Sequence, residues 1–372
     1  MDLAHIGGQL PADAPTLEEL LSKLVAVEGS DLHLKVGSPP VFRIDGTLTL
    51  SNLPKLTSDD TEHYARELIP EHLKPGFDTN HEADFAFGRQ TLGRFRVNVY
   101  RQRGSISIAM RAVLPASKNF TELGLPEVLA RLAQEPRGLI LVTGPTGAGK
   151  STTLAALIDE INSTRRVNII TLEDPIEVLH PDKLAIVSQR EVGVDTLSFK
   201  EALRRVLRQD PDVVLIGEMR DAETVDAALK AAETGHLVLS TLHTIDSTET
   251  INRIVDFFPT HQQNQVRLLL ASSLRGIVSQ RLLQRSDGHG RVPAVELFVN
   301  TERAFERITD PERTHELRDV IADGEFYGMQ TFDQALFKLY ESGVVSYQDA
   351  QANSTNPADF KLHARNKGLQ AS

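Results

Sequence analysis

The sequence predicts an α/β protein in which a smaller α+β domain precedes a parallel-sheet core and a helical region follows it. Three observations predict this class. From about residue 120, short continuously apolar runs alternate with helical segments, as in a parallel sheet covered on both faces. A glycine-rich loop, GPTGAGKS, follows the first of these runs. Before residue 113 the chain instead alternates apolar and polar residues, as strands with one solvated face do.

Length and composition restrict the class of protein further. The 372 residues suffice for two or three domains, and hydrophobic (40%) and charged (24%) contents are those of a globular protein. The absence of cysteine excludes disulfides and thiolate zinc sites. A net charge of −11 disfavours a nucleic-acid partner. The start, MDLAHIGGQL, lacks the pattern of a signal peptide, and we expect a cytoplasmic protein.

Residues 1–113 are predicted to form the α+β domain, after a loose leader of about a dozen residues. A helix opens at Thr16, which has capping-box spacing to Glu19, and Gly29 suits its exit. The alternating pattern then predicts strands within residues 31–46, 84–87, 93–100 and 105–113. Residues 114–119, LPASKN, are a plausible linker to the core over residues 120–290.

The glycine-rich loop has the composition of a phosphate cradle. Glycines allow backbone N–H groups to approach phosphate oxygens, and the helix that follows adds the positive end of its dipole. A lysine can reach the outer phosphates and a serine hydroxyl can ligate Mg²⁺. The predicted nucleotide-binding residues are Gly144, Pro145, Thr146, Gly147, Ala148, Gly149, Lys150, Ser151 and Thr152.

Polar side chains follow four predicted strands of the core. The strands are Leu139–Thr143, Val167–Leu172, Val213–Ile216 and Leu237–Leu242. The first ends in the phosphate loop, and the others end in Glu173-Asp174, Gly217-Glu218 and His243. Because ligands bind at the carboxyl ends of parallel strands, we expect these endings to converge on one site.

These endings supply the groups that hydrolysis of a terminal phosphate needs. Glu218 follows the run DVVLIG, where a P-loop enzyme keeps an acid near Mg²⁺ and the attacking water. Glu173 is a second candidate, although the acidic pair that it forms with Asp174 before a proline also suits an ordinary turn. His243 is placed to contact a γ-phosphate, whereas His236 is equally well explained as a structural residue.

Arginines are concentrated in the segment RFRVNVYRQR and beyond it. Most such residues form solvated positive faces. Arg94, Arg96, Arg103 and Arg111 are candidates for one shared face, since they lie on neighbouring predicted strands, and bidentate guanidinium groups suit a triphosphate.

Beyond Pro259 the sequence predicts a helical chain, with residues 291–372 as a separate helical region. A broad apolar stripe predicts one helix from His261 to Arg285. A second helix starts at Thr331, with Gln334 at capping-box spacing.

Five strings taken together resemble the secretion and pilus motor ATPases, and most closely the type IV pilus retraction ATPases of the PilT/PilU group. SDLHLKVGSPPVFRIDG is similar to the N-terminal signature of that family, GPTGAGKST to its Walker A loop and TLEDPIE to its Asp box. DPDVVLIGEMRDAET is similar to its Walker B region and AAETGHLVLSTLHT to its His box. The match covers nearly the whole chain in the same order.

The resemblance implies a PAS-like N-terminal domain, a RecA-like P-loop ATPase core and a homo-hexameric ring that uses ATP and Mg²⁺. By motif match, Lys150 and Ser151 hold phosphate and Mg²⁺, and Glu218 has the Walker B role, including metal binding. Glu173 is then the Asp-box acid, with His236 and His243 as the His-box residues. Which of the two glutamates polarises water stays open. Arginines of the N-terminal strands reach the nucleotide in such motors, and Arg96 and Arg111 are the favoured pair.

The resemblance also implies a cellular role. A pilus retraction motor lies at the inner face of the cytoplasmic membrane, where it turns a platform protein of that membrane, and a paralogous pilus motor is a further partner. Retraction is favoured over the alternatives, a pilus-extension or type II secretion motor, because those motors usually carry a four-cysteine metal site. AFERITDPER stands where retraction motors often have an AIRNLIRE-like motif, and GMQTFDQALFKLYESG is more similar to the accessory paralogue. Principal motor and accessory ATP-sensing subunit therefore both stay open.

Overall fold

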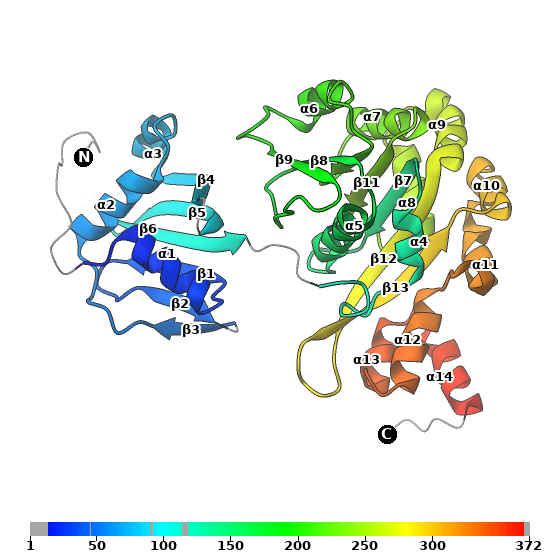
Figure 1. The fold of residues 1–372 in the computed structure, drawn as a ribbon. Coiled ribbons are helices and arrows are strands. Elements are labelled where there is room, and N and C mark those ends of the chain that lie inside the picture. The colour runs from blue at the N-terminus through cyan, green and yellow to red at the C-terminus, as the bar shows by residue number, and fades with distance from the viewer. Residues whose placement is uncertain (1–13, 45, 90–91, 114–117, 368–372) are drawn as a thin grey trace. The chain divides into compact units, whose positions relative to one another are not determined.

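The computed structural model describes residues 14–44, 46–89, 92–113 and 118–367, in two compact units of residues 1–114 and 115–372 (Figure 1). The predicted leader and residues 114–117 of the predicted linker lie outside the described residues. In the described part of the chain, no helix combines the length and the apolar character needed to cross a bilayer.

In its described residues, the first unit consists of a six-stranded antiparallel sheet and three helices. Its strand order is β3-β2-β1-β6-β5-β4. Residues that alternate along the strands, such as Leu32, Val97 and Ile108, form a buried core with α1 and α2. The strands are β1 (Asp31–Lys35), β2 (Val41–Ile44), β3 (Thr47–Leu50), β4 (Glu82–Arg89), β5 (Gly93–Gln102) and β6 (Ser105–Val113), and the helices are α1 (Leu17–Ala26), α2 (Ser58–Leu68) and α3 (Lys74–Asn80).

Helix α1 confirms the predicted capping box and corrects its predicted end. Thr16 accepts a hydrogen bond from the Glu19 backbone N–H, and the Glu19 carboxylate accepts one from the backbone N–H of Thr16. The left-handed residue after the helix is Glu28, at φ 51°, rather than Gly29. Gly29 has another reason to lack a side chain, because a Cβ there would lie 2.7 Å from Leu24 Cδ1.

The second unit is built on a seven-stranded sheet in the order β13-β12-β7-β11-β10-β8-β9. All neighbouring pairs are parallel except β12 with β13. The four predicted core strands are confirmed, with ends within about one residue of those expected. The strands are β7 (Gly138–Thr143), β8 (Asn168–Glu173), β9 (Ile186–Glu191), β10 (Val213–Ile216), β11 (Leu237–Leu242), β12 (Leu274–Gln284) and β13 (Arg291–Val299).

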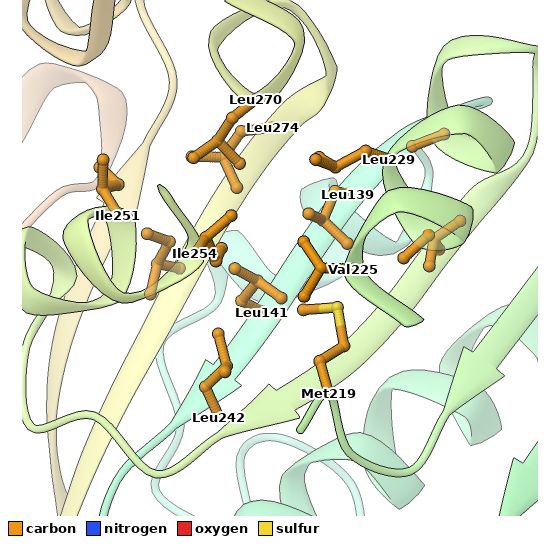
Figure 2. Packing of buried hydrophobic residues seen from close by; sticks show 14 of the residues in the cluster. Leu139, Leu141, Met219, Val225, Leu229, Leu242, Ile251, Ile254, Leu270 and Leu274 are labelled. Carbon is orange, nitrogen blue, oxygen red and sulfur yellow. The ribbon is translucent and has the colours of Figure 1, made fainter. Parts of the chain in front are cut away.

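Helices cover both faces of this sheet, as the continuously apolar strands predict. Along β7, Leu139 and Leu141 point to one face, where they form a cluster with residues of α7, α8 and α9 (Figure 2). Ile140 and Val142 point to the other face, toward α4 and α5. The helices are α4 (Val128–Ala133), α5 (Lys150–Thr164), α6 (Phe199–Val206), α7 (Ala222–Glu233), α8 (Ser247–Asp256) and α9 (Thr260–Ser273).

The predicted helix from His261 to Arg285 is wrong in its second half. Helix α9 ends at Ser273, and β12 begins at the next residue and pairs with β7 and β13 on its two sides. A strand buried on both faces carries apolar residues on both sides. The apolar residues of β12 therefore seemed to continue the apolar stripe of the helix before it. Gly276 suits this crowded place, because a Cβ there would lie 2.9 Å from Leu132 Cδ1. The region after residue 290, expected to be helical, also opens with the strand β13.

The regular elements after β13, up to residue 367, are helices. Thr331 and Gln334 form the predicted capping box at the start of α12. Phe332 and Leu336 of that helix pack with Leu283 and Val292, next to the β12–β13 hairpin. The elements are α10 (Glu302–Thr309), the short 3-10 helices η2 (Thr314–Glu316) and η3 (Glu325–Tyr327), α11 (Leu317–Ala322), α12 (Phe332–Glu341), α13 (Tyr347–Asn353) and α14 (Pro357–Asn366).

Candidate nucleotide-binding site

The phosphate loop joins the end of β7 to the start of α5, the expected strand, loop and helix. Gly144, Gly147 and Gly149 all have positive φ, at 140°, 81° and 91°. Gly149 is the N-cap of α5 and brings no side chain to the first backbone N–H groups of the helix. Those N–H groups and the helix dipole therefore face the loop, as phosphate binding requires.

Strand β12 packs directly against the phosphate loop. A Cβ on Gly144 would lie 2.5 Å from the backbone oxygen of Gln280, which is a contact that only glycine permits at that position. The buried Gln280 side chain also donates a hydrogen bond from Nε2 to Thr153 Oγ1 in α5, at 2.9 Å. Gln280 is not among the predicted site residues. The available signal was a glutamine inside a run that was expected to be helical.

Lys150 lies at the first position of α5 and turns back over the loop. Its Nζ donates to the backbone oxygens of Gly144 (2.7 Å) and Pro145 (3.1 Å), and lies 3.5 Å from His243 Nδ1. Burial lowers the pKa of Lys150, and the nearby carboxylate of Glu218 opposes that shift. The lysine is thus held at the loop, and its contact with phosphate stays a prediction.

Glu218 and His243 meet at the carboxyl edge of the sheet. Glu218 follows β10 and His243 follows β11, and the two strands are parallel neighbours. His243 Nε2 lies 3.2 Å from Glu218 Oε1. Lys150, Glu218 and His243, which are far apart in the sequence, therefore form one cluster.

Arg220 completes the surroundings of Glu218. Its guanidinium lies 2.7 Å from Glu218 Oε2. The hydrogen bond from Arg220 lowers the pKa of Glu218, with smaller contributions from the charges of His243 and Lys150. Glu218 is thus held as a carboxylate. The sequence analysis quoted Arg220 within the Walker B string without giving it a role.

Glu173, at the end of β8, has the opposite electrostatic environment. Burial raises its pKa, although its carboxylate accepts hydrogen bonds from Thr171 Oγ1 (2.6 Å), Gln189 Nε2 (3.1 Å) and the Glu177 backbone (3.3 Å). Two carboxyl groups at one sheet edge are therefore shifted in opposite directions. Such a pair is suited to separate acid and base roles.

His236 lies at the other end of β11 from His243. The six residues of β11 lie between them, and at about 3.3 Å per residue the two histidines are about 23 Å apart along the strand. His236 Nδ1 lies 3.0 Å from the backbone oxygen of Ala231, and the His236 oxygen accepts from Gly138 N. The structure therefore does not bring His236 to the cluster, and the local contacts match its structural interpretation.

Three of the four candidate arginines of the first unit lie on one face of the β5–β6 pair, and the fourth, Arg103, does not. Arg96 is directly opposite Arg111 in the β5–β6 pair, and Arg94 lies two residues away on the same side of β5. Arg103 lies instead in the turn at the far end of that hairpin. Arg111 Nε donates to Asp31 Oδ1 at 2.8 Å. The contact of Arg96 and Arg111 with a nucleotide stays a prediction.

The residues at the loop fit a magnesium nucleotide. Ser151 is exposed at the start of α5, next to Lys150, and Glu218 supplies a carboxylate oxygen. Mg²⁺ prefers such hard oxygen ligands and is commonly shared between one or two side chains and phosphate oxygens.

Comparisons with known proteins identify the family of this chain. The family model described as Type II/IV secretion system protein matches residues 15–358. The type IV pilus retraction ATPase PilT of Pseudomonas aeruginosa is 42% identical over 344 residues, which are 92% of this chain and 99% of PilT. The type IV pilus ATPase PilU of the same organism is 41% identical over 345 residues, 93% of this chain and 90% of PilU.

Solved structures of pilus and secretion ATPases also match this chain. The crystal structure of the pilus retraction motor PilT with bound ADP matches with a TM-score of 0.85 and 45% identity, over 94% of this chain and all of that chain. The ATPase DotB of Legionella pneumophila matches with a TM-score of 0.73 and 26% identity, over 92% and 97% of the two chains. The chain belongs to the family of type II/IV secretion system proteins. Within it, this protein is a nucleotide-binding P-loop ATPase of the PilT/PilU-like group.

Proposed function

We propose that this protein is a homo-hexameric motor that hydrolyses ATP with Mg²⁺ and drives the retraction of type IV pili. The cluster of Lys150, Glu218 and His243 at the phosphate loop is the observation that carries the proposal. Similarity to the retraction ATPase PilT along nearly the whole chain supports it.

Each residue of the cluster has a role that follows from its position. The loop N–H groups and Lys150 bind the phosphates and stabilise negative charge that develops on them. Glu218, held as a carboxylate by Arg220, orients the attacking water and accepts its proton. His243 contacts both Lys150 and Glu218, so it is placed to respond to a γ-phosphate between them.

Magnesium binding is part of the proposal. Ser151 and Glu218 are the residues that would hold Mg²⁺, together with the phosphate oxygens of the nucleotide. The ion would neutralise phosphate charge during hydrolysis.

The activity is tested by changing Lys150. We expect Lys150→Ala to lower ATP turnover by a factor of about 100 or more, because one preorganised charge at the transition state is lost. Phosphate release by the purified protein measures this. Lys230→Ala, which removes an exposed lysine paired with Asp226 on α7, is the matched control and should turn over ATP like the wild type. Equal activity of Lys150→Ala and the wild type would refute the site.

The cellular role is tested in a deletion strain. We propose that the protein works at the inner face of the cytoplasmic membrane against a platform protein of that membrane. Loss of retraction, with more pili on the surface and no twitching, is expected for a retraction motor. Loss of pili would instead identify an extension or secretion motor. Complementation with Lys150→Ala should restore protein but not retraction.

An accessory role in retraction is a second candidate. The near-equal identity to PilU and PilT favours neither paralogue. In this case the protein acts as an ATP-sensing subunit on a paralogous pilus motor. ATP turnover that rises only when the purified paralogue is added would select this role, and full turnover alone would exclude it.

A further inference from the structure

Glu296 is a buried acid in the outermost strand on one side of the core sheet. It lies in the middle of β13, in the run VPAVELFV, and only 7% of it is exposed. Burial raises the pKa of Glu296, so the sheet holds a carboxyl group at a free-energy cost that an apolar residue would not have. The charge of Arg281 favours the carboxylate and that of Asp246 opposes it, and the hydrogen-bond partners of Glu296 indicate what it does.

The partner of Glu296 is the beginning of α8. Glu296 Oε1 accepts hydrogen bonds from both the backbone N–H (2.9 Å) and the hydroxyl (2.8 Å) of Ser247, the first residue of that helix. A carboxylate at a helix N-terminus is also favoured by the helix dipole. The strand β13 is thereby fastened to α8 by a buried, doubly hydrogen-bonded contact.

The segment from His243 to Ser247 has little freedom of its own. Thr244 Oγ1 lies 2.6 Å from Thr250 Oγ1 within α8, in a buried contact. The Ile245 backbone N–H donates to Glu249 Oε2 at 3.1 Å. Thr244 and Ile245, which follow His243 directly, are therefore attached to the first turns of α8, and we expect a shift of those turns to be passed on to His243.

Glu296 is also in register with the strand that enters the phosphate loop. Ser279 of β12 is opposite Glu296 on one side and opposite Thr143 of β7 on the other. Thr143 Oγ1 donates to Ser279 Oγ at 2.9 Å, and Thr143 directly precedes Gly144. This row of buried polar residues ends at the contact with Ser247, so it joins the start of α8 to the strand that enters the phosphate loop.

We infer that Glu296 is a positioning residue for ATP hydrolysis, whose carboxyl oxygen fixes the start of α8 and so keeps His243 beside Lys150 and Glu218. The inference rests on the proposed role of that cluster. Glu296 touches neither Lys150 nor the loop glycines in the described contacts, so it acts through Ser247 and His243. Its effect should appear in turnover rather than in the binding of ADP, which lacks the γ-phosphate.

The test compares Glu296→Ala with Glu296→Gln. Glu296→Ala removes the acceptor oxygen, and we expect kcat to fall about 10-fold to 100-fold, as small displacements of reacting groups do. ADP affinity, measured by isothermal titration calorimetry, should stay within about twofold of the wild type, since the phosphate loop is unchanged. Glu296→Gln keeps an Oε1 that can accept both bonds, so kcat should return to within about threefold of the wild type.

A second variant keeps the test decisive if Glu296→Ala does not fold. Ser247→Ala removes one of the two donors at small cost, and should lower kcat by about twofold to fivefold. Where Glu296→Ala and the double variant both fold, kcat of Ser247→Ala combined with Glu296→Ala should be no lower than kcat of Glu296→Ala alone. Both changes remove the same contact.

The outcomes separate this inference from the proposed function. Wild-type kcat in Ser247→Ala, additive losses in the double variant, or equal losses of kcat and ADP affinity in a folded Glu296→Ala would overturn it. If the wild type itself turned over ATP no faster than Lys150→Ala, the proposed function would fail instead. Thermal unfolding of each variant shows which proteins are folded.

Discussion

At the scale of single residues, the site contrasts two glutamates at one sheet edge. Glu218 is stabilised as a carboxylate by Arg220, whereas burial favours the protonated form of Glu173. The difference arises from the ion pair with Arg220, two residues after Glu218, and from the depth at which Glu173 is buried. Both acids could be predicted from their positions after apolar runs, but their electrostatics could not.

Arg220 gives a prediction for the pH dependence of ATP turnover. Its hydrogen bond lowers the pKa of Glu218, so Arg220→Ala should let that pKa rise toward the ordinary value. Less Glu218 is then ionised at mildly acidic pH, and the acidic limb of the kcat profile should move to higher pH. His243 and Lys150 also face Glu218, and both side chains remain in the variant. A pH series of phosphate release measures the shift.

The matched control for Arg220 is Arg303→Ala. Arg303 forms an exposed ion pair with Asp323, at 3.0 Å, and such pairs contribute little. Its profile should overlay that of the wild type. An Arg220→Ala profile that also overlays the wild type would show that Glu218 does not control the acidic limb.

Sequence reasoning found most of the cluster and missed the residues that support it. Lys150, Glu218 and His243 were predicted because the carboxyl ends of parallel strands share an edge, and the structure confirms their proximity. Gln280 and Glu296 were missed because their strands were taken as helical. A glutamate alternating with apolar residues in VPAVELFV was the available signal, since a strand places it on one defined face.

At the scale of elements, the loop glycines give a matched pair of substitutions. Gly144 and Gly147 both have positive φ, which costs an alanine roughly 1–2 kcal/mol. At Gly147 the space around an added Cβ is open to 4 Å, whereas at Gly144 the Cβ would meet the backbone oxygen of Gln280. Gly144→Ala should therefore lower the free energy of unfolding well beyond that backbone cost, and Gly147→Ala should not.

Urea unfolding of the two glycine variants without nucleotide measures the difference. Nucleotide is left out because an alanine at either glycine also changes phosphate binding. Equal unfolding free energies of the two variants would mean that the β12 backbone at Gln280 moves aside for the added Cβ and does not support the loop.

At the scale of the whole molecule, the two units have separate cores. The described clusters of buried apolar residues each fall within one unit, from Leu17 to Met110 in the first and from Phe120 to Ala364 in the second. We expect residues 1–113 to fold alone, with a cooperative transition and an unfolding free energy of about 5 kcal/mol or more. Circular dichroism during urea unfolding measures this.

A shorter fragment is the control for the isolated unit. A fragment ending at residue 100 lacks β6, which lies between β1 and β5 in the sheet. That fragment should show no cooperative transition. The same behaviour in residues 1–113 would show that the first unit needs the rest of the chain.

The junction of α9 and β12 has a mechanical consequence. The last helical residue, Ser273, is followed directly by the first strand residue, Leu274, with no linker to absorb displacement. A tilt of α9 would therefore displace β12. In that strand, Ser279 contacts Thr143 and the backbone oxygen of Gln280 lies against Gly144, where the phosphate loop begins. We therefore expect a force that displaces α9 to be transmitted through β12 to the phosphate loop, with no intervening linker to absorb it.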